Sequence, residues 1–429
     1  MVAIQSWEEE LTRPSKDFFK AYVNATKNDE DLILAVRSAI KVLVPVVDWQ
    51  GFLPHMPHGL LGISSVFRLR DSLDTRSFRR ALGTQLHYFA HEGRAPSAKR
   101  PVMGSGSFKN IKMGIQKQHP EIAFGEVMGI SVPTDSDFDS LIALVKKDMS
   151  NMGHKLVFVH HMKYLFIQLG RPKATGRWLL GICAWLAGCT PDTFWNERAQ
   201  IRLNQDLTLP GTDASVLSTT SNSYLRTVVN EYGLVQMLNE WTSATLKGLT
   251  PPEMIKILLL SSSDKLLDAR RDLEGKTSWL FTYLESLWFS EDAKEDLVIW
   301  SQAAALVNLF PSEEESLRMT TELQNSRSKL KLSDAILDVE PQKAFTIANT
   351  LLNTAGLSEN VVTEVAQAIA WGDPIYNYSH HSLALASLIH LRHQIEPKIW
   401  NYAMCSLCKS IANSQGSSEL SQQLDRLLD

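Results

Sequence analysis

Apolar residues recur at intervals of three and four along most of this chain. The spacing is clearest in 32–49, 139–149, 225–241 and 361–371. An α-helix turns once every 3.6 residues, so this spacing gathers apolar side chains on one face that can be buried. Short alternating segments, which would indicate β-strands, are scarce. The sequence therefore predicts an all-α fold.

Glycine-rich turns of the kind that bind nucleotides are not evident. The stretch MGSGSF at 103–108 lacks the full dinucleotide fingerprint, and it follows a proline-containing loop instead of a strand. A Rossmann or P-loop site is therefore not expected, and no nucleotide-binding motif is assigned.

Two polar segments interrupt the helical pattern of the chain. Residues 94–120 are rich in Pro, Gly, Ser and Lys and are expected to form a long loop, typical of a lid or connection. Residues 204–222 are expected to link an N-terminal helical lobe, 1–203, to a C-terminal one, 223–429. We expect a single large multi-helix domain with two lobes and a metal or substrate cavity between its helices.

The net charge and the hydropathy of the chain indicate which classes of partner are not expected. The formal net charge is −4 and no block of Lys and Arg stands out, so a nucleic-acid partner is not expected. The N-terminus lacks the basic-then-apolar run of a signal peptide. The most apolar stretch, 178–189, is too short to span a bilayer and is typical of a buried helix. We expect a cytoplasmic protein without a membrane partner, and the oligomeric state stays open.

The four cysteines form two pairs in apolar helical stretches, Cys183 with Cys189 and Cys405 with Cys408. Four thiolates can hold zinc, but the first pair is widely spaced. Free cysteine behaves as a small hydrophobe, so we expect core thiols.

The twelve histidines are the side chains best suited to carry chemistry. None lies between His161 and His380. Neutral imidazole is the commonest protein ligand for transition metals, and a helical metal site takes its ligands from several helices. The histidines occur at His55, His58, His87, His91, His119, His154, His160, His161, His380, His381, His390 and His393.

The first two histidine groups differ in how well they suit a role as metal ligands. Pro57 suits a first helical turn, so His58 is expected at the start of a helix, either as a metal ligand or as a polar entry residue. His87 and His91 are four residues apart, a spacing used in paired-His metal sites. They lie at the edge of an apolar stripe, however, so we expect a solvated or capping role.

The last two groups interrupt apolar runs. Burying His160 and His161 together is costly unless at least one finds a partner or a ligand. Adjacent helical residues point about 100° apart, so the two are not expected to face one site. His380 and His381 are expected at the mouth of a buried helix, as metal ligands or as a polar entrance.

Three histidine contexts, in this order, resemble the questin oxidase-like family, helical oxygenase-type proteins of aromatic polyketide metabolism. HGLLGISSVFRLRD begins at His58, and RSFRRALGTQLHYFA, which follows it, is similar to the family's next helix. LVFVH ends at His160, and AIAWGDPIYNYSHH ends at His381. The chain departs from the family pattern at Ser65, where a second histidine is common, and it has no early Asn-His-Gly-Pro motif. Leu383 or Ala384 stands where the third motif usually carries a lysine.

The resemblance implies an oxygenase that binds Fe(II) through His58, His160 and His380 or His381. It implies Baeyer–Villiger-like or ring-cleaving chemistry on a small aromatic, polyketide-like molecule, with NADPH as a candidate reductant. No further catalytic residue is assigned, and Trp185, Tyr376 and Tyr378 are expected to line the cavity. Two alternatives stay open: a metal-free cyclase or decarboxylase-type enzyme, and a non-enzymatic helical scaffold for a partner protein.

Overall fold

The computed structural model describes residues 2–47, 57–92, 102–189, 220–269, 277–290, 296–310, 331–354, 356–372, 375–415 and 419–428. Its regular elements are helices, and no β-strand occurs among these residues. The prediction of an all-α fold is confirmed. The chain forms two compact units. Unit 1 comprises Met1–Val145, Lys155–Pro191 and Ser417–Asp429, and unit 2 comprises Lys146–His154 and Asp192–Gly416. The two-lobe boundary predicted within 204–222 stays a prediction, because 204–219 lie outside the described residues.

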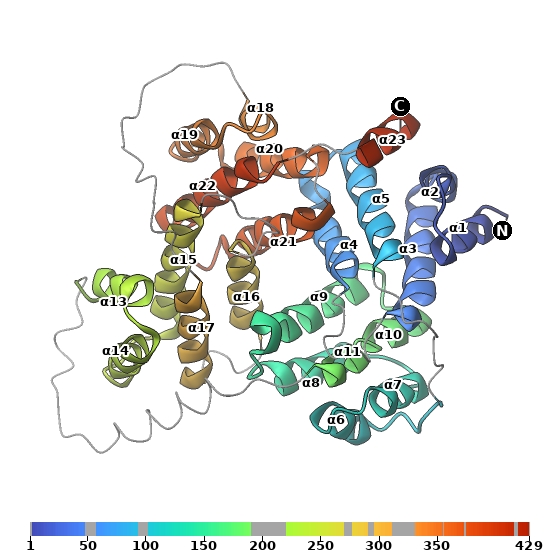
Figure 1. Cartoon of the computed structure of the whole chain (residues 1–429), viewed down its shortest axis with the longest axis horizontal. Helices are drawn as coiled ribbons and strands as arrows, with labels where there is room; N and C mark the ends of the chain where they lie inside the picture. Colours follow the sequence, from blue (N-terminus) through green and yellow to red (C-terminus); the bar gives the residue numbers. More distant parts are fainter. Residues whose placement is uncertain are drawn as a thin grey trace. The chain divides into compact units, whose positions relative to one another are not determined.

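The helices of unit 1 come from both ends of the chain (Figure 1). They are α1 (Val2–Thr12), α2 (Phe18–Ala25), α3 (Asp29–Leu43), η1 (Val44–Val46), α4 (His58–Arg68), η2 (Arg70–Ser72), α5 (Thr75–His91), α6 (Phe108–Gln116), α7 (Pro120–Gly129), α8 (Asp135–Val145), α9 (His154–Gln168, of which His154 is counted with unit 2), α10 (Lys173–Leu180), α11 (Cys183–Gly188) and α23 (Glu419–Leu428).

The helices of unit 2 follow one another in the second half of the chain (Figure 1). They are α13 (Thr220–Glu231), α14 (Leu234–Leu246), α15 (Pro251–Asp268), α16 (Trp279–Trp288), α17 (Leu297–Leu309), α18 (Leu332–Leu337), α19 (Pro341–Leu352), α20 (Ser358–Trp371), α21 (Ile375–Leu391) and α22 (Pro397–Asn413), preceded by the short turn η3 (Ser150–Gly153).

Helix α4 packs against α5 in unit 1 at unusually short range. A Cβ atom on Gly59 would lie 2.6 Å from Phe89, and one on Gly62 would lie 1.7 Å from the Gln85 side chain. Residue numbers fall on α5 as they rise on α4, so the two helices are antiparallel. The C-terminal end of α5 therefore lies beside the first turn of α4.

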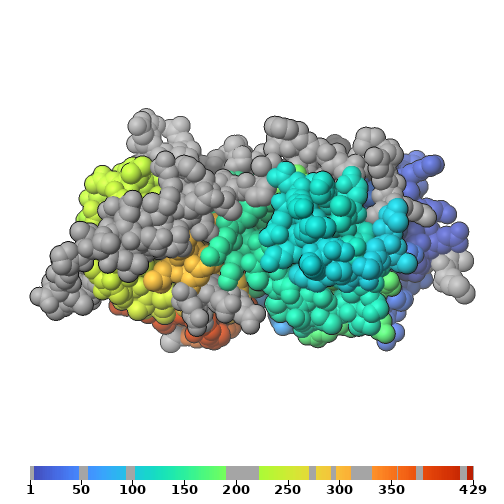
Figure 2. Space-filling view, turned by 90° about the horizontal axis from the view of Figure 1, so that it is seen from below, coloured from blue at the N-terminus to red at the C-terminus, as the bar shows by residue number. Residues whose placement is uncertain are grey.

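The predicted loop over 94–120 is wrong in its second half. Residues Phe108–Gln116 form α6, which packs on α7. Ile111 and Ile115 are buried, and Gly114 lies so close to Ala123 that a Cβ atom would be 2.9 Å from that residue's backbone nitrogen. The buried pair of isoleucines outweighs the loop-like composition around it. Figure 2 shows the outer face of this α6–α8 region in cyan to teal.

The buried apolar stretch 178–189 is confirmed as helical, but it is divided between α10 and α11 by a turn at Gly181. A Cβ atom there would lie 2.6 Å from the Phe124 ring. All four cysteines are free and buried, which confirms core thiols.

The stack of His87 on His91 predicts acid sensitivity of unit 1. The two rings lie 4.0 Å apart, and His87 also stacks on Phe19. Burial, and then the neighbouring charge of His91, lowers the pKa of His87 to about 3. Below its ordinary pKa of about 6.5 the unfolded chain binds a proton on this residue while the folded chain does not.

We therefore expect the free energy of unfolding to fall by up to about 1 kcal/mol per pH unit between pH 6.5 and 3. Urea titrations at several pH values measure this slope. The variant His87→Phe should flatten it, since a phenyl ring keeps the stack without titrating. An unchanged slope in that variant would assign the acid sensitivity to other groups.

Unit 2 is built around α16, whose ten side chains are all buried. It packs against α21, and α15 packs against α22 (Figure 1). The fully buried Glu285 carboxylate accepts hydrogen bonds from His390 Nδ1 at 2.6 Å and from the Ser387 hydroxyl at 3.4 Å. His390 in turn stacks on Phe289 at 3.8 Å. These contacts fix the register of α16 on α21. Because residue numbers rise together along the two helices, they run parallel.

Candidate metal centre

A strained turn precedes His154. Asn151, Met152 and Gly153 have φ angles of 52°, 57° and 75°, all in the left-handed region. A Cβ atom on Gly153 would lie 2.4 Å from the Tyr283 ring, so only glycine fits there. Two consecutive non-glycine residues in this conformation are costly, and such strain is concentrated at functional sites. The turn ends directly before His154, which is the first residue of α9.

Three contacts within unit 2 fix the ring of His154. Nδ1 is hydrogen-bonded to the Asn151 carbonyl oxygen. A carbonyl oxygen only accepts, so Nδ1 carries the proton and Nε2 presents its lone pair. The ring lies flat on Trp279, with centroids 3.6 Å apart and planes 12° apart. The Trp279 indole N–H donates to the Met152 carbonyl at 3.1 Å. Metal-binding histidines are typically oriented in this way, with one ring nitrogen held by a carbonyl or carboxylate.

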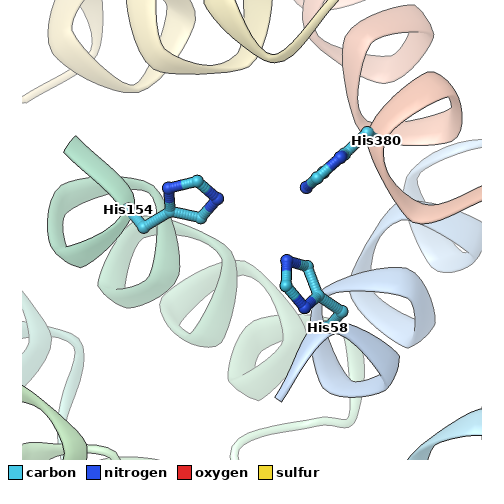
Figure 3. A group of neighbouring side chains, drawn as sticks. All are labelled: His58, His154 and His380. Atoms are coloured by element: carbon cyan, nitrogen blue, oxygen red, sulfur yellow. The ribbon is translucent and has the colours of Figure 1, made fainter. Parts of the chain in front are cut away.

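His380 is the neighbour of His154 in unit 2, and it lies inside α21, which begins at Ile375, instead of at the mouth of the helix. It is 7% exposed, and His154 is 3% exposed. The His380 ring lies edge-on to both His154 and Trp279, at 6.0 and 5.2 Å. A ligand nitrogen of His380 lies within 4.8 Å of one on His154. Nitrogens that share one ion at about 2.1 Å lie up to about 4.2 Å apart, so small ring rotations suffice for both to bind it. Figure 3 shows the two rings turned toward one another.

His58 stands at the start of α4, which is linked to α9 within unit 1. The Ser64 hydroxyl contacts His161 Nδ1 at 3.1 Å, and the Arg68 guanidinium lies 5.3 Å from the centre of the Tyr164 ring. Residue numbers rise together along both helices, so these run parallel.

The other predicted ligands lie elsewhere on their helices. His160, on α9, is half-buried, and its ring centre lies 5.8 Å from that of His161. His161 is fully buried and contacts the Ser64 hydroxyl and the Arg68 guanidinium. His381 is buried beside His380. Within the described residues, the grouping of histidines that can share one ion includes His154 and neither His160 nor His381.

His154 was not singled out from the sequence. It shares with His58 a position at a helix start directly after a residue that favours a turn, Gly153 in one case and Pro57 in the other. This signal is local and weak. What distinguishes His154 is the packing of Trp279, more than a hundred residues away in the chain, against its ring.

An apolar wall lies next to the start of α4 in unit 1. A small cavity of about 10 Å³ is lined by Pro57 and Leu60 together with Val44, Val47, Trp178, Leu179, Ile182 and Trp185. Trp185 is fully buried and its ring lies 5.3 Å from Phe158. The predicted cavity residues Tyr376 and Tyr378 lie outside the side chains that the structure describes. Beside His58, the surroundings are thus apolar, as a water-excluding site requires.

Among the described helices, none combines the length and the apolarity needed to cross a bilayer. Comparison of the chain with protein-family models, curated proteins and solved structures found no match.

Proposed function

We propose that this chain is a non-haem iron oxygenase in which His154 and His380 of unit 2 bind Fe(II). The observation that carries the proposal is His154, whose ring is buried, stacked on Trp279 and hydrogen-bonded through Nδ1 to the Asn151 carbonyl, beside His380. Imidazole suits iron, copper, nickel and zinc. Two neutral ligands leave coordination positions open, and an Fe(II) ion with open positions would supply the activation of O2.

The chain's own contribution is to hold these ligands and exclude water. His154 and His380 are almost fully buried, and Trp279 covers one face of His154. The side chains around the start of α4 in unit 1 are apolar. We propose an aromatic, polyketide-like small molecule as the substrate.

The fate of the two atoms of O2 distinguishes two forms of the reaction. A ring-cleaving dioxygenase places both atoms of O2 in the product and needs no external reductant. A Baeyer–Villiger-like monooxygenase inserts one atom beside a ring carbonyl and releases the other as water. That second reaction consumes two electrons and two protons from a reductant such as NADPH.

The test begins with anaerobic loading of the protein with Fe(II). Nitric oxide, a stable substitute for O2, should then give the half-integer-spin EPR signal of an Fe(II)–nitric oxide adduct, because the iron has an open position. A polyhydroxylated anthraquinone is next supplied with ¹⁸O2, and the product is analysed by mass spectrometry. We expect uptake of ¹⁸O with Fe(II) and none with Zn(II). Turnover without O2 and in the presence of chelator would instead indicate a metal-free enzyme, and absence of the EPR signal would contradict the iron site.

A further inference from the structure

An open groove lies along α3 in unit 1. Helix α3 packs against both α1 and α10 (Figure 1), and side chains of all three helices line the groove. Its volume of about 460 Å³ is within the range of sites that bind small molecules. All of its lining residues belong to unit 1, and none is a ligand in the proposed metal site.

Much of the groove is apolar. Its apolar lining residues are Ile4, Leu34, Ala174 and Trp178. Leu34 is 49% exposed and Trp178 is half-buried, so both present apolar surface to solvent. Such surface in a concave place favours a ligand with an apolar body, and the indole offers a flat face on which an aromatic ring can stack.

The charged side chains of the groove are mainly basic. Arg37 and Lys41 are four residues apart and share one face of α3. The acidic member, Glu8, accepts the Ser38 hydroxyl at 2.5 Å and lies 3.9 Å from Lys41, which is 63% exposed. The Arg37 guanidinium donates to the Leu169 carbonyl, and within the described ranges it pairs with no carboxylate. A net positive charge therefore remains in the groove.

The aromatic face and the positive charge lie at the same end of α3. Arg37 contacts Leu169, and further along both segments Trp178 shares the small interior cavity with Val44. Residue numbers therefore rise together along α3 and the segment that leads into α10. This direction places Trp178 beside the last turn of α3, to which Lys41 belongs.

We propose that this groove binds a small aromatic carboxylate, whose ring stacks on Trp178 and whose carboxylate faces Lys41 and Arg37. Carboxylates form charge-assisted hydrogen bonds with ammonium and guanidinium groups, and these are stronger than hydrogen bonds between neutral groups. The site requires no metal, so neither this proposal nor the proposed function rests on the other.

Two probes of nearly equal shape test the proposal, 2-naphthoate and the neutral 2-naphthamide. Each is titrated into the full-length protein by isothermal titration calorimetry at neutral pH, with a chelator present so that no metal binds the carboxylate. We expect one 2-naphthoate per chain, bound about 10-fold more tightly than 2-naphthamide, because only the carboxylate forms charge-assisted hydrogen bonds. Equal affinities for the two probes, or no binding of 2-naphthoate, would overturn the proposal.

Lys41→Gln removes one charge from an exposed side chain, so the fold should tolerate it. We expect this variant to bind 2-naphthoate about 3- to 5-fold more weakly and 2-naphthamide as the wild type does. Trp178→Leu should weaken the binding of both probes, because both lose the stacking surface. Lys112→Gln is the matched control, since Lys112 is an exposed lysine of unit 1 on α6, outside the groove. If Lys41→Gln and Lys112→Gln changed the affinity for 2-naphthoate equally, the groove would not be its site.

Discussion

Replacing His154 by alanine is expected to weaken Fe(II) binding by more than about 100-fold. Removing a ligand should cost at least as much as removing a residue that merely orients one. The loss is measured as a dissociation constant by anaerobic competition with a chromogenic chelator. His380→Ala should show a loss of similar size, because its ligand nitrogen lies within 4.8 Å of that of His154.

Two control variants make this result specific. His393→Ala removes an exposed histidine that follows α21, and it should bind Fe(II) like the wild type. His160→Ala separates the ligand set expected from sequence, which includes His160, from the set proposed on geometry, which includes His154. Equal losses in His154→Ala and His160→Ala would contradict the geometric set.

Trp279→Ala is expected to lower the free energy of unfolding by about 3–5 kcal/mol, the usual cost of truncating a large buried aromatic side chain. The Trp279 side chain is fully buried and carries the His154 stack. Urea denaturation measures this loss. We also expect Fe(II) affinity to fall by about 10-fold or more, since His154 loses the surface that holds its ring.

Trp241→Ala is the matched control for this variant. Trp241 is also fully buried in unit 2, on α14, so its truncation should cost a similar free energy of unfolding. It should leave the Fe(II) affinity of the folded protein unchanged. Trp279→Phe lacks the indole N–H that donates to the Met152 carbonyl. It should still retain most of the Fe(II) affinity, because it keeps an aromatic face against His154. If both alanine variants changed affinity equally, the stack on His154 would have no special role.

The fold class was predictable from the sequence because helix formation here follows from local spacing. The segment 32–49, for example, contains the periodic apolar face that becomes buried in α3. Helix α6 was missed because its buried face is only Ile111 and Ile115, set among residues typical of loops. Local composition favours a loop there, whereas tertiary packing stabilises a helix, and the packing has the larger effect.

The candidate site was predictable only in part. His58 was identified because it begins a helix, and His380 because it precedes an apolar run, although α21 begins earlier, at Ile375. His154 depends on a turn with left-handed backbone at Asn151 and Met152, and on Trp279 from a distant part of the chain. No periodic pattern encodes such contacts. The contact of His161 with Ser64, which lies far away in the chain, is likewise not encoded in a local pattern.

The metal content of the purified protein tests the central claim most directly. The wild type, loaded anaerobically with Fe(II) and dialysed, is analysed by inductively coupled plasma mass spectrometry beside His154→Ala and His160→Ala. We predict about one iron per chain in the wild type and in His160→Ala, and almost none in His154→Ala. A wild-type protein without iron, or a His154→Ala variant that retains it fully, would contradict the account.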